Sequence, residues 1–486
     1  MGVLPSSLSE VSAIHLPAAL VALFFGYNLI QFFAMKWRLR KFKGPFALPF
    51  VGNIYTPESA IFLGFLGKLK KRYGRTFAFF AFFRSYLIVC EPSVVRRILS
   101  DTKTFIKGSD YSDTFKAVFG EGLVTSNSEK HKKDKATFGK YFVRSNVSSY
   151  ADMMNRYTRD MMASHLGNVQ GAINIEEFFA LLSLRVFMTF ATNYNYADRP
   201  EREEEIAHMV SHGSGLVGAF VVFGIPIKSW VPGAQAVLDI GPALMSDLNP
   251  VIAERRRAMA ADELPDLDDP LTAMIRENLS TQDIQDHMVT LVCAGHDTTA
   301  FFTAYMSLLL AEHPDVQDKL RDEILKQCGD KESVTGDDVY EMKYMQIVMK
   351  EVFRMYSIIP AITRHATEEV HIKEAGITIP AGQDILIPMF LINRDPELWD
   401  EPGKFKPERF LDSGDQFTSA KLGYFPFGYG TRVCIGNTLA YIESGIFMAH
   451  LLRKFRFEPE PGFKPMINAG ISLTTTNGIN VILKSL

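Results

Sequence analysis

The stretch FPFGYGTRVCIGN, residues 425–437, holds one cysteine and one arginine within a glycine-rich loop. Glycine-rich loops commonly cradle phosphate, but the phosphate pattern G-x-x-x-x-G-K-[ST] is absent from the chain. Glycine permits backbone conformations that other residues avoid, so Gly428, Gly430 and Gly436 can bend the loop around Cys434. The thiolate is the form of cysteine that binds metals, and nearby N–H groups or a helix N-terminus stabilise it. The stretch therefore predicts a loop built to hold an ionised sulfur.

A second candidate lies in residues 286–314, an apolar run that predicts a long buried helix. Asp297, Thr298 and Thr299 interrupt this run, although a buried polar group without a partner costs about 1–3 kcal/mol. Gly295 adds a cost of about 1 kcal/mol relative to alanine inside a helix. We expect the helix to widen at this point and to leave a carbonyl free for water or a ligand. A hydrophilic seam inside a helix bundle is the alternative.

Two further segments combine glutamate with arginine. Glu351 and Arg354 are spaced to share one face of a helix. The segment FKPERF, residues 405–410, supplies Arg409. Taken singly, such a pair is a common surface ion pair worth less than about 1 kcal/mol, so it indicates nothing alone.

These features occur in one order along the chain: a proline-rich segment, then A-G-x-D-T-T, E-x-x-R, P-E-R-F and F-x-x-G-x-R-x-C-x-G. That set resembles the cytochrome P450 superfamily, specifically its membrane-anchored eukaryotic type, over essentially the whole chain. The last pattern is matched at every fixed position, namely Phe427, Gly430, Arg432, Cys434 and Gly436. The resemblance implies a mainly α fold with small β-sheets, preceded by an N-terminal transmembrane helix.

The resemblance also implies haem b as cofactor, with Cys434 as the axial thiolate ligand of its iron and O2 as co-substrate. Arg432 and Arg364 match residues that bind the haem propionates. Where the family usually carries W-x-x-x-R, this chain has His131 and Lys135 at the same spacing. Lysine is a point charge and cannot form the bidentate contact of arginine, so we expect a weaker propionate clamp.

For catalysis, the resemblance assigns proton delivery during O2 scission to Asp297 and Thr298. His296, at the variable position between Gly295 and Asp297, receives no role. The residues that match the structural triad of the family, rather than its catalytic groups, are Glu351, Arg354 and Arg409.

The implied activity is that of a monooxygenase that inserts one oxygen atom into a lipophilic substrate, using electrons from an NADPH-dependent reductase. One alternative is a haem-thiolate isomerase or dehydratase of lipid peroxides. Such relatives tend to alter the threonine of A-G-x-D-T-T and the cysteine loop, whereas this chain retains both. The other alternative is a non-enzymatic haem-binding protein, which the intact Asp297 and Thr298 pair disfavours.

The substrate pocket of the family maps to segments that are mostly apolar here, which suits a lipophilic ligand. A sterol or a fatty-acid-like lipid is our expectation for the substrate. The predicted pocket residues are Phe115, Phe119, Leu291, Ala294, Ile358, Ile359, Ala361, Ile362 and Ile471.

The elements that position these groups begin with a membrane segment. Residues 11–35 carry no Asp, Glu, Lys or Arg, and about 20 apolar residues suffice to cross a bilayer. Five cations follow within residues 36–43, which by the positive-inside rule places the catalytic domain in the cytosol. We expect a single-pass anchor in the endoplasmic reticulum membrane. A hydrophobic helix docked on the body, or one lying in the membrane interface, is the alternative.

Three regions are therefore predicted: a membrane anchor at 1–35, a basic and proline-rich hinge at 36–53, and a haem-binding catalytic domain at 54–486. Short apolar runs at 77–83 and 86–90 predict a buried hairpin, with Cys90 as a core residue. Residues 216–233 are apolar and interrupted by glycine and proline, which indicates either core packing or a lid that contacts the membrane.

Composition limits the partners. The net charge of -3 gives no overall footprint for nucleic acid, and the four cysteines are too scattered for a disulfide framework or a zinc site. No dinucleotide-binding fingerprint follows a predicted strand, so electrons must come from a partner. The resemblance implies NADPH–cytochrome P450 reductase, with cytochrome b5 as a further donor. Lys132 and Lys133 form a local basic patch that could attract the acidic reductase, although a solvated face is the alternative.

Overall fold

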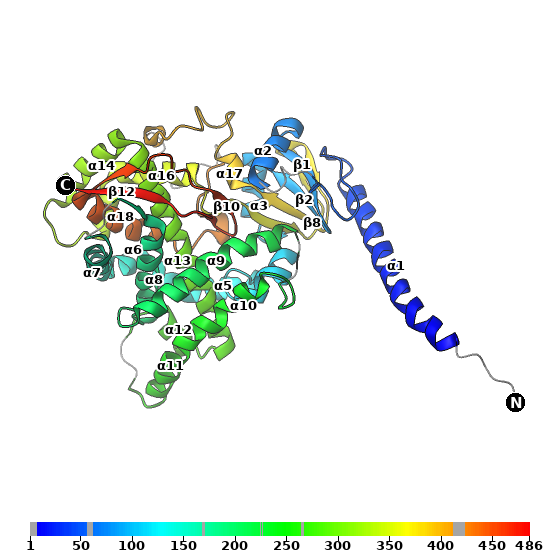
Figure 1. The fold of residues 1–486 in the computed structure, drawn as a ribbon, viewed down its shortest axis with the longest axis horizontal. Helices are drawn as coiled ribbons and strands as arrows, with labels where there is room; N and C mark the ends of the chain where they lie inside the picture. Colours follow the sequence, from blue (N-terminus) through cyan, green and yellow to red (C-terminus); the bar gives the residue numbers. More distant parts are fainter. Residues whose placement is uncertain are drawn as a thin grey trace.

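The computed structural model describes residues 7–55, 62–167, 171–223, 225, 227–263, 267–411 and 423–486. The molecule has a mostly helical body, and one long helix, α1 (Ser7–Arg38), projects away from it (Figure 1). The predicted class, mainly α with small β-sheets, is confirmed. Residues 1–6 of the predicted anchor lie outside the described part of the chain.

The helices that follow α1 make up most of the body. In chain order they are α2 (Phe62–Tyr73), α3 (Pro92–Ser100), α4 (Lys116–Phe119), α5 (Ser128–Gly139), α6 (Arg144–Ser149), α7 (Ala151–Met161), α8 (Ile175–Thr192), α9 (Pro200–Phe223), α10 (Ala234–Leu238), α11 (Ile240–Ala260), α12 (Pro270–Arg276), α13 (Thr281–Glu312), α14 (Pro314–Cys328), α15 (Gly336–Glu341), α16 (Lys343–Met355), α17 (Met389–Ile392) and α18 (Asn437–Lys454).

The strands are short and fall into several sheets. They are β1 (Thr76–Ala81), β2 (Arg84–Val89), β3 (Phe105–Ile106), β4 (Ala172–Asn174), β5 (Ile362–Ala366), β6 (Val370–Ile372), β7 (Ile377–Ile379), β8 (Gln383–Ile387), β9 (Phe455–Pro459), β10 (Ile467–Ala469), β11 (Leu473–Thr475) and β12 (Asn480–Ser485). The largest described sheet has the order β1-β2-β8-β5-β3, and a smaller one has the order β4-β12-β9. The remaining described strands pair as β6 with β7 and β10 with β11.

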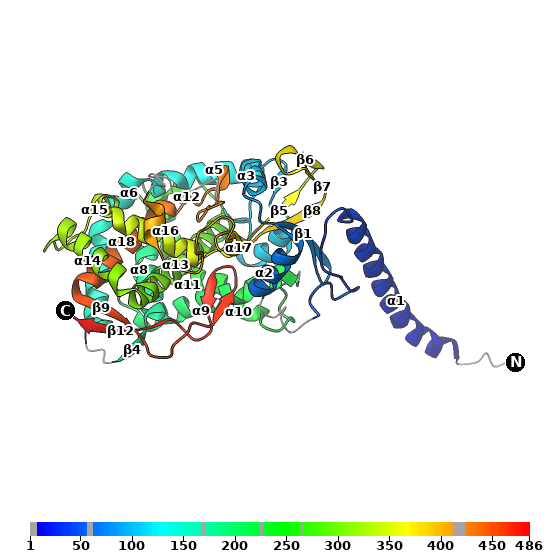
Figure 2. The ribbon, with the colours of Figure 1, turned by 90° about the horizontal axis from the view of Figure 1, so that it is seen from above.

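The five-stranded sheet lies at the end of the body nearest α1 (Figure 2). Its first two strands form the predicted antiparallel hairpin, in which Thr76 pairs with Val89 and Ala81 pairs with Arg84. Cys90 is fully buried directly after β2, as predicted for a core residue. Strand β8 joins β2 in parallel and pairs with β5 on its other side, so it connects the hairpin to Arg364 of β5.

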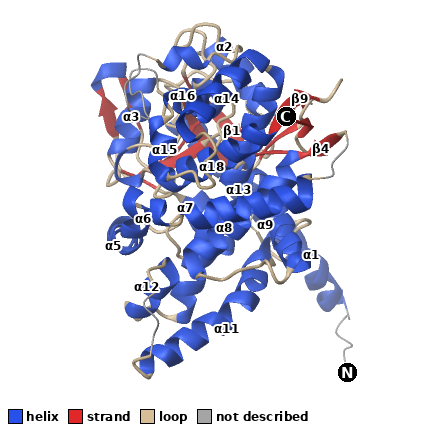
Figure 3. Cartoon of the chain, turned by 90° about the vertical axis from the view of Figure 1, so that its left-hand side faces the viewer, coloured by secondary structure: helices blue, strands red, loops and turns tan. Residues whose placement is uncertain are grey.

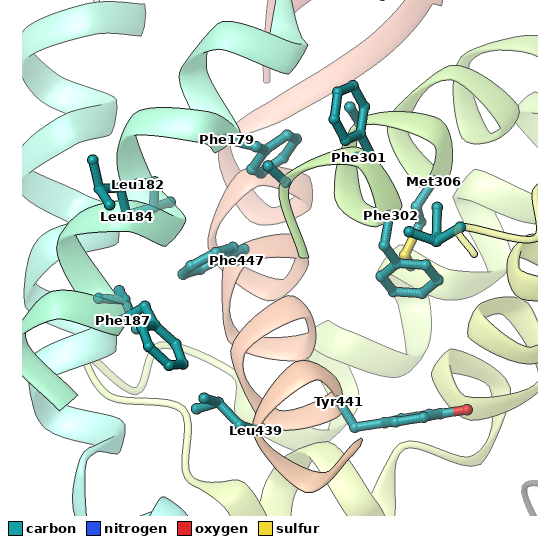
Figure 4. Packing of buried hydrophobic residues seen from close by; sticks show 14 of the residues in the cluster. Phe179, Leu182, Leu184, Phe187, Phe301, Phe302, Met306, Leu439, Tyr441 and Phe447 are labelled. Carbon is teal, nitrogen blue, oxygen red and sulfur yellow. The ribbon is translucent and has the colours of Figure 1, made fainter. Parts of the chain in front are cut away.

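Helix α13 runs through the middle of the helical part and packs along α8 (Figure 3). The hydroxyl of Ser280 accepts a hydrogen bond from the N–H group of Asp283 at 3.0 Å, which caps the start of the helix. Aromatic side chains from three helices, including Phe179 of α8, Phe302 of α13 and Phe447 of α18, meet in the core around it (Figure 4). This tight packing fixes the position of the polar residues in the middle of α13.

Gly295 has a different role from the one predicted. Helix α13 is continuous from Thr281 to Glu312, so the expected widening is not seen. A Cβ atom at Gly295 would lie 2.1 Å from the ring of Phe187 on α8. The glycine therefore allows the two helices to approach closely, and its cost in helix propensity is offset by aromatic packing.

Helix α1 has features of both the predicted membrane span and its alternative, a hydrophobic helix docked on the body. Residues 18–38 are long and apolar enough to cross a membrane, and their outer part is almost entirely exposed. The end of α1 instead packs on the body, because Phe32 and Leu39 are buried and Arg38 Nη1 donates to the carbonyl of Gly382 at 2.6 Å. The helix is thus free along its outer part and docked at its base.

The hinge after α1 is tied to β1. At Gly52 the backbone has φ +67°, and a Cβ atom there would lie 2.3 Å from the carbonyl oxygen of Phe80. Asn53 Oδ1 accepts a hydrogen bond from the N–H group of Phe80 at 2.7 Å. These contacts make the segment a fixed connection between α1 and the five-stranded sheet.

The segment 216–233 shows features of both its predicted interpretations. Val217 and Ile227 are buried, whereas Trp230 is 77% exposed. A Cβ atom at Gly218 would lie 2.5 Å from Gly470, so α9 closely approaches the β10–β11 turn. Residues 224 and 226 lie outside the described part.

Candidate active site

A cavity of about 380 Å³ lies between the middle of α13 and the loop at 425–437. Its wall combines segments that are far apart in the sequence, including residues 107–135, 357–364 and 470–471. No Asp or Glu occurs among the described residues that line it. The cavity is therefore the place where the sulfur, the arginines and the interrupted helix predicted from the sequence come together.

The cysteine loop needs glycine at two positions. Gly428 has φ +79° and Gly430 has φ +72°, a region that side chains with a Cβ atom rarely adopt. A Cβ atom at Gly430 would also lie 2.8 Å from the carbonyl oxygen of Leu99. Gly436 differs, because its φ is -85° and the space next to it allows ordinary contact. The predicted bend thus depends on the first two glycines, and the third caps the start of α18.

Cys434 presents its side chain to this cavity. Its N–H group donates to the carbonyl of Phe427 at 2.8 Å, which closes the loop. Burial raises the pKa of the Cys434 thiol, while the N–H group of Gly436 and the charge of Lys135 oppose that rise. A thiol with these surroundings is suited to bind a metal, since coordination favours the thiolate.

Five basic side chains line the same cavity without an acidic partner in its described wall: Lys107, His131, Lys135, Arg364 and Arg432. Arg432 Nη1 donates to the carbonyl of Ser126 at 2.7 Å, and Arg364 Nη1 donates to the carbonyl of Thr363 at 2.7 Å. Buried cations are stable only when anions or strong acceptors compensate them. The cluster therefore calls for a ligand with negative charges at this end, and the two propionates of haem fit that requirement.

His131 is a neutral member of the cluster. Burial, with the charges of Arg432 and Lys107, lowers the pKa of His131 to about 3. Burial likewise lowers the pKa of Arg432 to about 10, and that of Lys107 falls well below its ordinary value. In all three residues burial is the largest cause of the shift in pKa, and neighbouring positive charges add to it. A neutral His131 can donate a hydrogen bond but contributes no charge to a propionate.

The other side of the cavity carries the predicted proton-delivery pair. Thr298 lines the cavity, and its hydroxyl donates to the carbonyl of Ala294 at 2.8 Å. Asp297 is buried and accepts a hydrogen bond from the hydroxyl of Ser472 at 2.5 Å. Burial raises the pKa of Asp297 to about 6, although the hydrogen bond from Ser472 and the nearby hydroxyl groups of two serines of α9 oppose the shift. The two residues are adjacent in sequence but face different surroundings.

The remaining wall is mostly apolar. The predicted pocket residues that line it are Phe115, Leu291, Ala294, Ile358, Ile359, Ala361, Ile362 and Ile471. The prediction for Phe119 is wrong in this respect, because the ring of Phe119 stacks on Phe115 at 5.9 Å and lies behind it. His296 is fully buried away from the cavity, in agreement with its lack of a predicted role.

Glu351, Arg354 and Arg409 lie outside the cavity and bind one another. Arg354 donates to both oxygens of Glu351, from Nε at 2.7 Å and from Nη2 at 2.8 Å. Arg409 Nε donates to the same carboxylate at 3.0 Å. Glu351 and Arg354 are fully buried, so this is a structural network, not a surface ion pair.

Several cavity residues were not predicted from the sequence. Lys107 lies in a segment without a recognisable pattern, and Tyr111 shares the predicted pocket segment of Phe115 but was not itself predicted. Only the fold brings both residues to Arg364. Outside the cavity wall, Ser472 follows the predicted Ile471, but nothing in the sequence indicates its bond to Asp297. Contacts of this kind join distant segments, so residue spacing carries no signal for them.

Comparison with known proteins agrees with the site. The family model for cytochrome P450 matches residues 42–482. Cytochrome P450 734A1 of Arabidopsis thaliana is 27% identical over 440 residues, covering 86% of this chain and 81% of that protein. Cytochrome P450 72A13 of the same plant is 26% identical, covering 84% of this chain and 81% of that protein. Cytochrome P450 71A8 of Mentha piperita is 29% identical over 64% of both chains. The chain therefore belongs to the cytochrome P450 family of haem-thiolate monooxygenases.

Proposed function

We propose that this chain is a membrane-anchored monooxygenase that inserts one oxygen atom of O2 into a lipophilic substrate. The observation that carries the proposal is one cavity in which the sulfur of Cys434, the hydroxyl of Thr298 and a cluster of basic side chains meet, with no acidic residue in its described wall. When bound, haem b would supply the activation of O2 at its iron.

The residues of the chain would hold the haem and handle the protons. Cys434 would hold the iron as a thiolate, and Arg364, Arg432 and Lys107 would compensate the propionate charges. Asp297, with a pKa of about 6, can hold or release a proton near neutral pH. Thr298 would then orient a proton at its hydroxyl within the cavity.

A sterol or a fatty-acid-like lipid is the proposed substrate class. The wall away from the cations is formed by aliphatic and aromatic side chains such as Phe115, Leu291, Ile358 and Ile471. A site of this composition gains most of its binding free energy from apolar burial, about 25 cal/mol for each Å² removed from water. Substrate-induced changes in the spin state of the haem iron, measured with a panel of lipids, would identify the class.

Membrane attachment and electron supply complete the proposal. Residues 1–35 would anchor the chain in the endoplasmic reticulum membrane, 36–53 would act as the hinge, and 54–486 would form the catalytic domain in the cytosol. Electrons would come from NADPH–cytochrome P450 reductase, with cytochrome b5 as a second donor. Lys132 and Lys133 are exposed on α5, which supports a docking patch for an acidic partner.

The test is the substitution Cys434→Ser. A thiolate ligand gives the reduced, CO-bound haem protein a characteristic long-wavelength Soret band, which this variant should lose. Retention of the band would refute the assignment of the ligand. Product formation that depends on NADPH and a purified reductase would separate the monooxygenase from an isomerase and from a non-enzymatic haem protein.

A further inference from the structure

The two residues that occupy the W-x-x-x-R positions point to different partners. His131 belongs to the cation cluster, where Arg432 and Lys107 act on it. Lys135 instead donates from Nζ to the carbonyls of Thr431 and Val433, both at 2.8 Å. The two residues share one face of α5, but Lys135 is bonded to the cysteine loop, whereas His131 lies under the influence of the cation cluster.

The acceptors of Lys135 belong to the cysteine loop. Val433 directly precedes Cys434, and Thr431 lies two residues before Val433. A hydrogen bond from a charged donor is stronger than one between neutral groups, so two such bonds restrain the loop more strongly than neutral contacts would. Arg432, between the two acceptors, extends to Ser126 and Asn127, at 2.7 and 3.2 Å. The loop is thus held by its own arginine and by the lysine of α5.

The charge of Lys135 also acts on the sulfur. Lys135 Nζ lies 2.8 Å from the carbonyl oxygen of Val433, the residue that directly precedes Cys434, so the ammonium lies next to the segment that carries the sulfur. The acceptors of Lys135 are neutral carbonyls, and within the described residues no carboxylate pairs with it to cancel its charge. An uncancelled positive charge near the sulfur favours the more negative state of a thiolate–iron pair.

We propose that Lys135 is a positioning residue of the cysteine loop that raises the reduction potential of the haem iron, and that propionate binding is left to Arg364, Arg432 and Lys107. This inference rests on the proposed haem ligation by Cys434. It differs from the role expected for Lys135 from its sequence position, where it would pair with a propionate.

The test compares Lys135→Met, which removes the charge and the donors, with Lys135→Arg, which keeps both. The ferric, haem-bound proteins are titrated with dithionite, so that each iron gains one electron. We expect Lys135→Met to lower the equilibrium constant for reduction by about tenfold, which is about 59 mV for a one-electron couple. Lys135→Arg should keep most of the reduction potential of the unmodified protein. Lys132→Met, at an exposed position of the same helix, is the control and should leave the potential unchanged.

A second measurement does not depend on iron reduction. Amide hydrogen exchange in residues 430–435 of the haem-bound protein should accelerate in Lys135→Met and not in the Lys132 control, because the two carbonyl contacts are lost. The rate of haem transfer to an acceptor protein should rise less in Lys135→Met than in Lys107→Met. Rapid haem loss from Lys135→Met with an unchanged potential and unchanged exchange would overturn the inference and make Lys135 a propionate ligand.

The CO-bound spectrum separates this inference from the proposed function. We expect the long-wavelength band to persist in Lys135→Met, since Cys434 is still present. Its persistence together with an unchanged potential would overturn the role of Lys135 and leave the proposed function standing. Absence of the band from the unmodified protein would overturn both.

Discussion

Asp297 offers a quantitative test of the structure, because a buried carboxyl makes stability depend on pH. Its side chain is 2% exposed, and one of its oxygens has no hydrogen-bond partner in the described structure. Burial raises its pKa from 3.8 to about 6. The variant Asp297→Asn keeps the shape of the side chain but cannot ionise.

The direction in which stability changes with pH follows from which state, folded or unfolded, holds the proton. Below pH 3.8 the carboxyl is protonated in both the folded and the unfolded state, so it adds no pH dependence. Between pH 3.8 and about 6 the unfolded chain releases the proton and the folded protein retains it, so stability falls as pH rises. A shift of about two pKa units corresponds to about 3 kcal/mol, which is fully lost only above pH 6.

The assay is urea unfolding of the haem-bound proteins at several pH values. Between pH 5 and pH 7.5, the free energy of unfolding of Asp297→Asn should rise relative to the unmodified protein by about 1.4 kcal/mol. The absolute difference includes a constant contribution from the new amide, so the change with pH is the informative quantity. Ser472→Ala removes the hydroxyl that donates to Asp297 and should raise the pKa of that carboxyl further. The pH range over which stability falls should therefore move to higher pH.

The control for this slope is Asp330→Asn, at an exposed position in the turn after α14. This variant makes the same chemical change at an exposed residue, so it controls for the effect of the substitution itself. A difference between Asp297→Asn and the unmodified protein that stays constant from pH 5 to pH 7.5 would show that Asp297 is not a buried carboxyl with a raised pKa.

Three further predictions concern catalysis, stability and partner binding. Thr298→Ala should retain haem and substrate binding but separate NADPH consumption from product formation; unchanged coupling would mean that protons arrive by another route. Glu351→Gln should lower the free energy of unfolding, measured in urea, by about 3 kcal/mol, because its buried arginine partner loses its counter-charge, whereas Glu401→Gln at an exposed pair should have a much smaller effect. Lys132→Glu with Lys133→Glu should slow the first electron transfer from the reductase and flatten its salt dependence, with the CO spectrum intact; equally fast stopped-flow reduction at low salt would place the docking patch elsewhere.

Much of the fold could be predicted because its signals are local. Apolar periodicity indicated α13, and the short runs around Arg84 indicated the β1–β2 hairpin. The positive φ values of Gly428 and Gly430 likewise follow from a loop that must turn sharply. In each case the residues that carry the signal are also the residues that form the element.

The prediction was wrong where a distant segment decides the outcome. Gly295 suggested a widened helix, but the glycine instead accommodates Phe187 of α8. Phe119 occupies a pocket segment by sequence, yet the ring of Phe115 separates it from the cavity. Neither Phe187 nor the ring orientation is visible in the spacing of the neighbouring residues, because packing between elements determines both.

The five-stranded sheet connects the membrane segment to the cavity. Phe32 of α1 packs its ring 6.1 Å from that of Phe80 on β1, and the hinge bonds to the same strand. Farther across the sheet, Tyr86 of β2, Leu386 of β8 and Arg364 of β5 all line the cavity. A hydrogen-bonded sheet transmits position with little change, so in the proposed membrane-anchored arrangement the base of α1 would set how the cavity faces the bilayer. A lipophilic substrate dissolved in the membrane would therefore meet the cavity in one orientation, which supports the proposed substrate class.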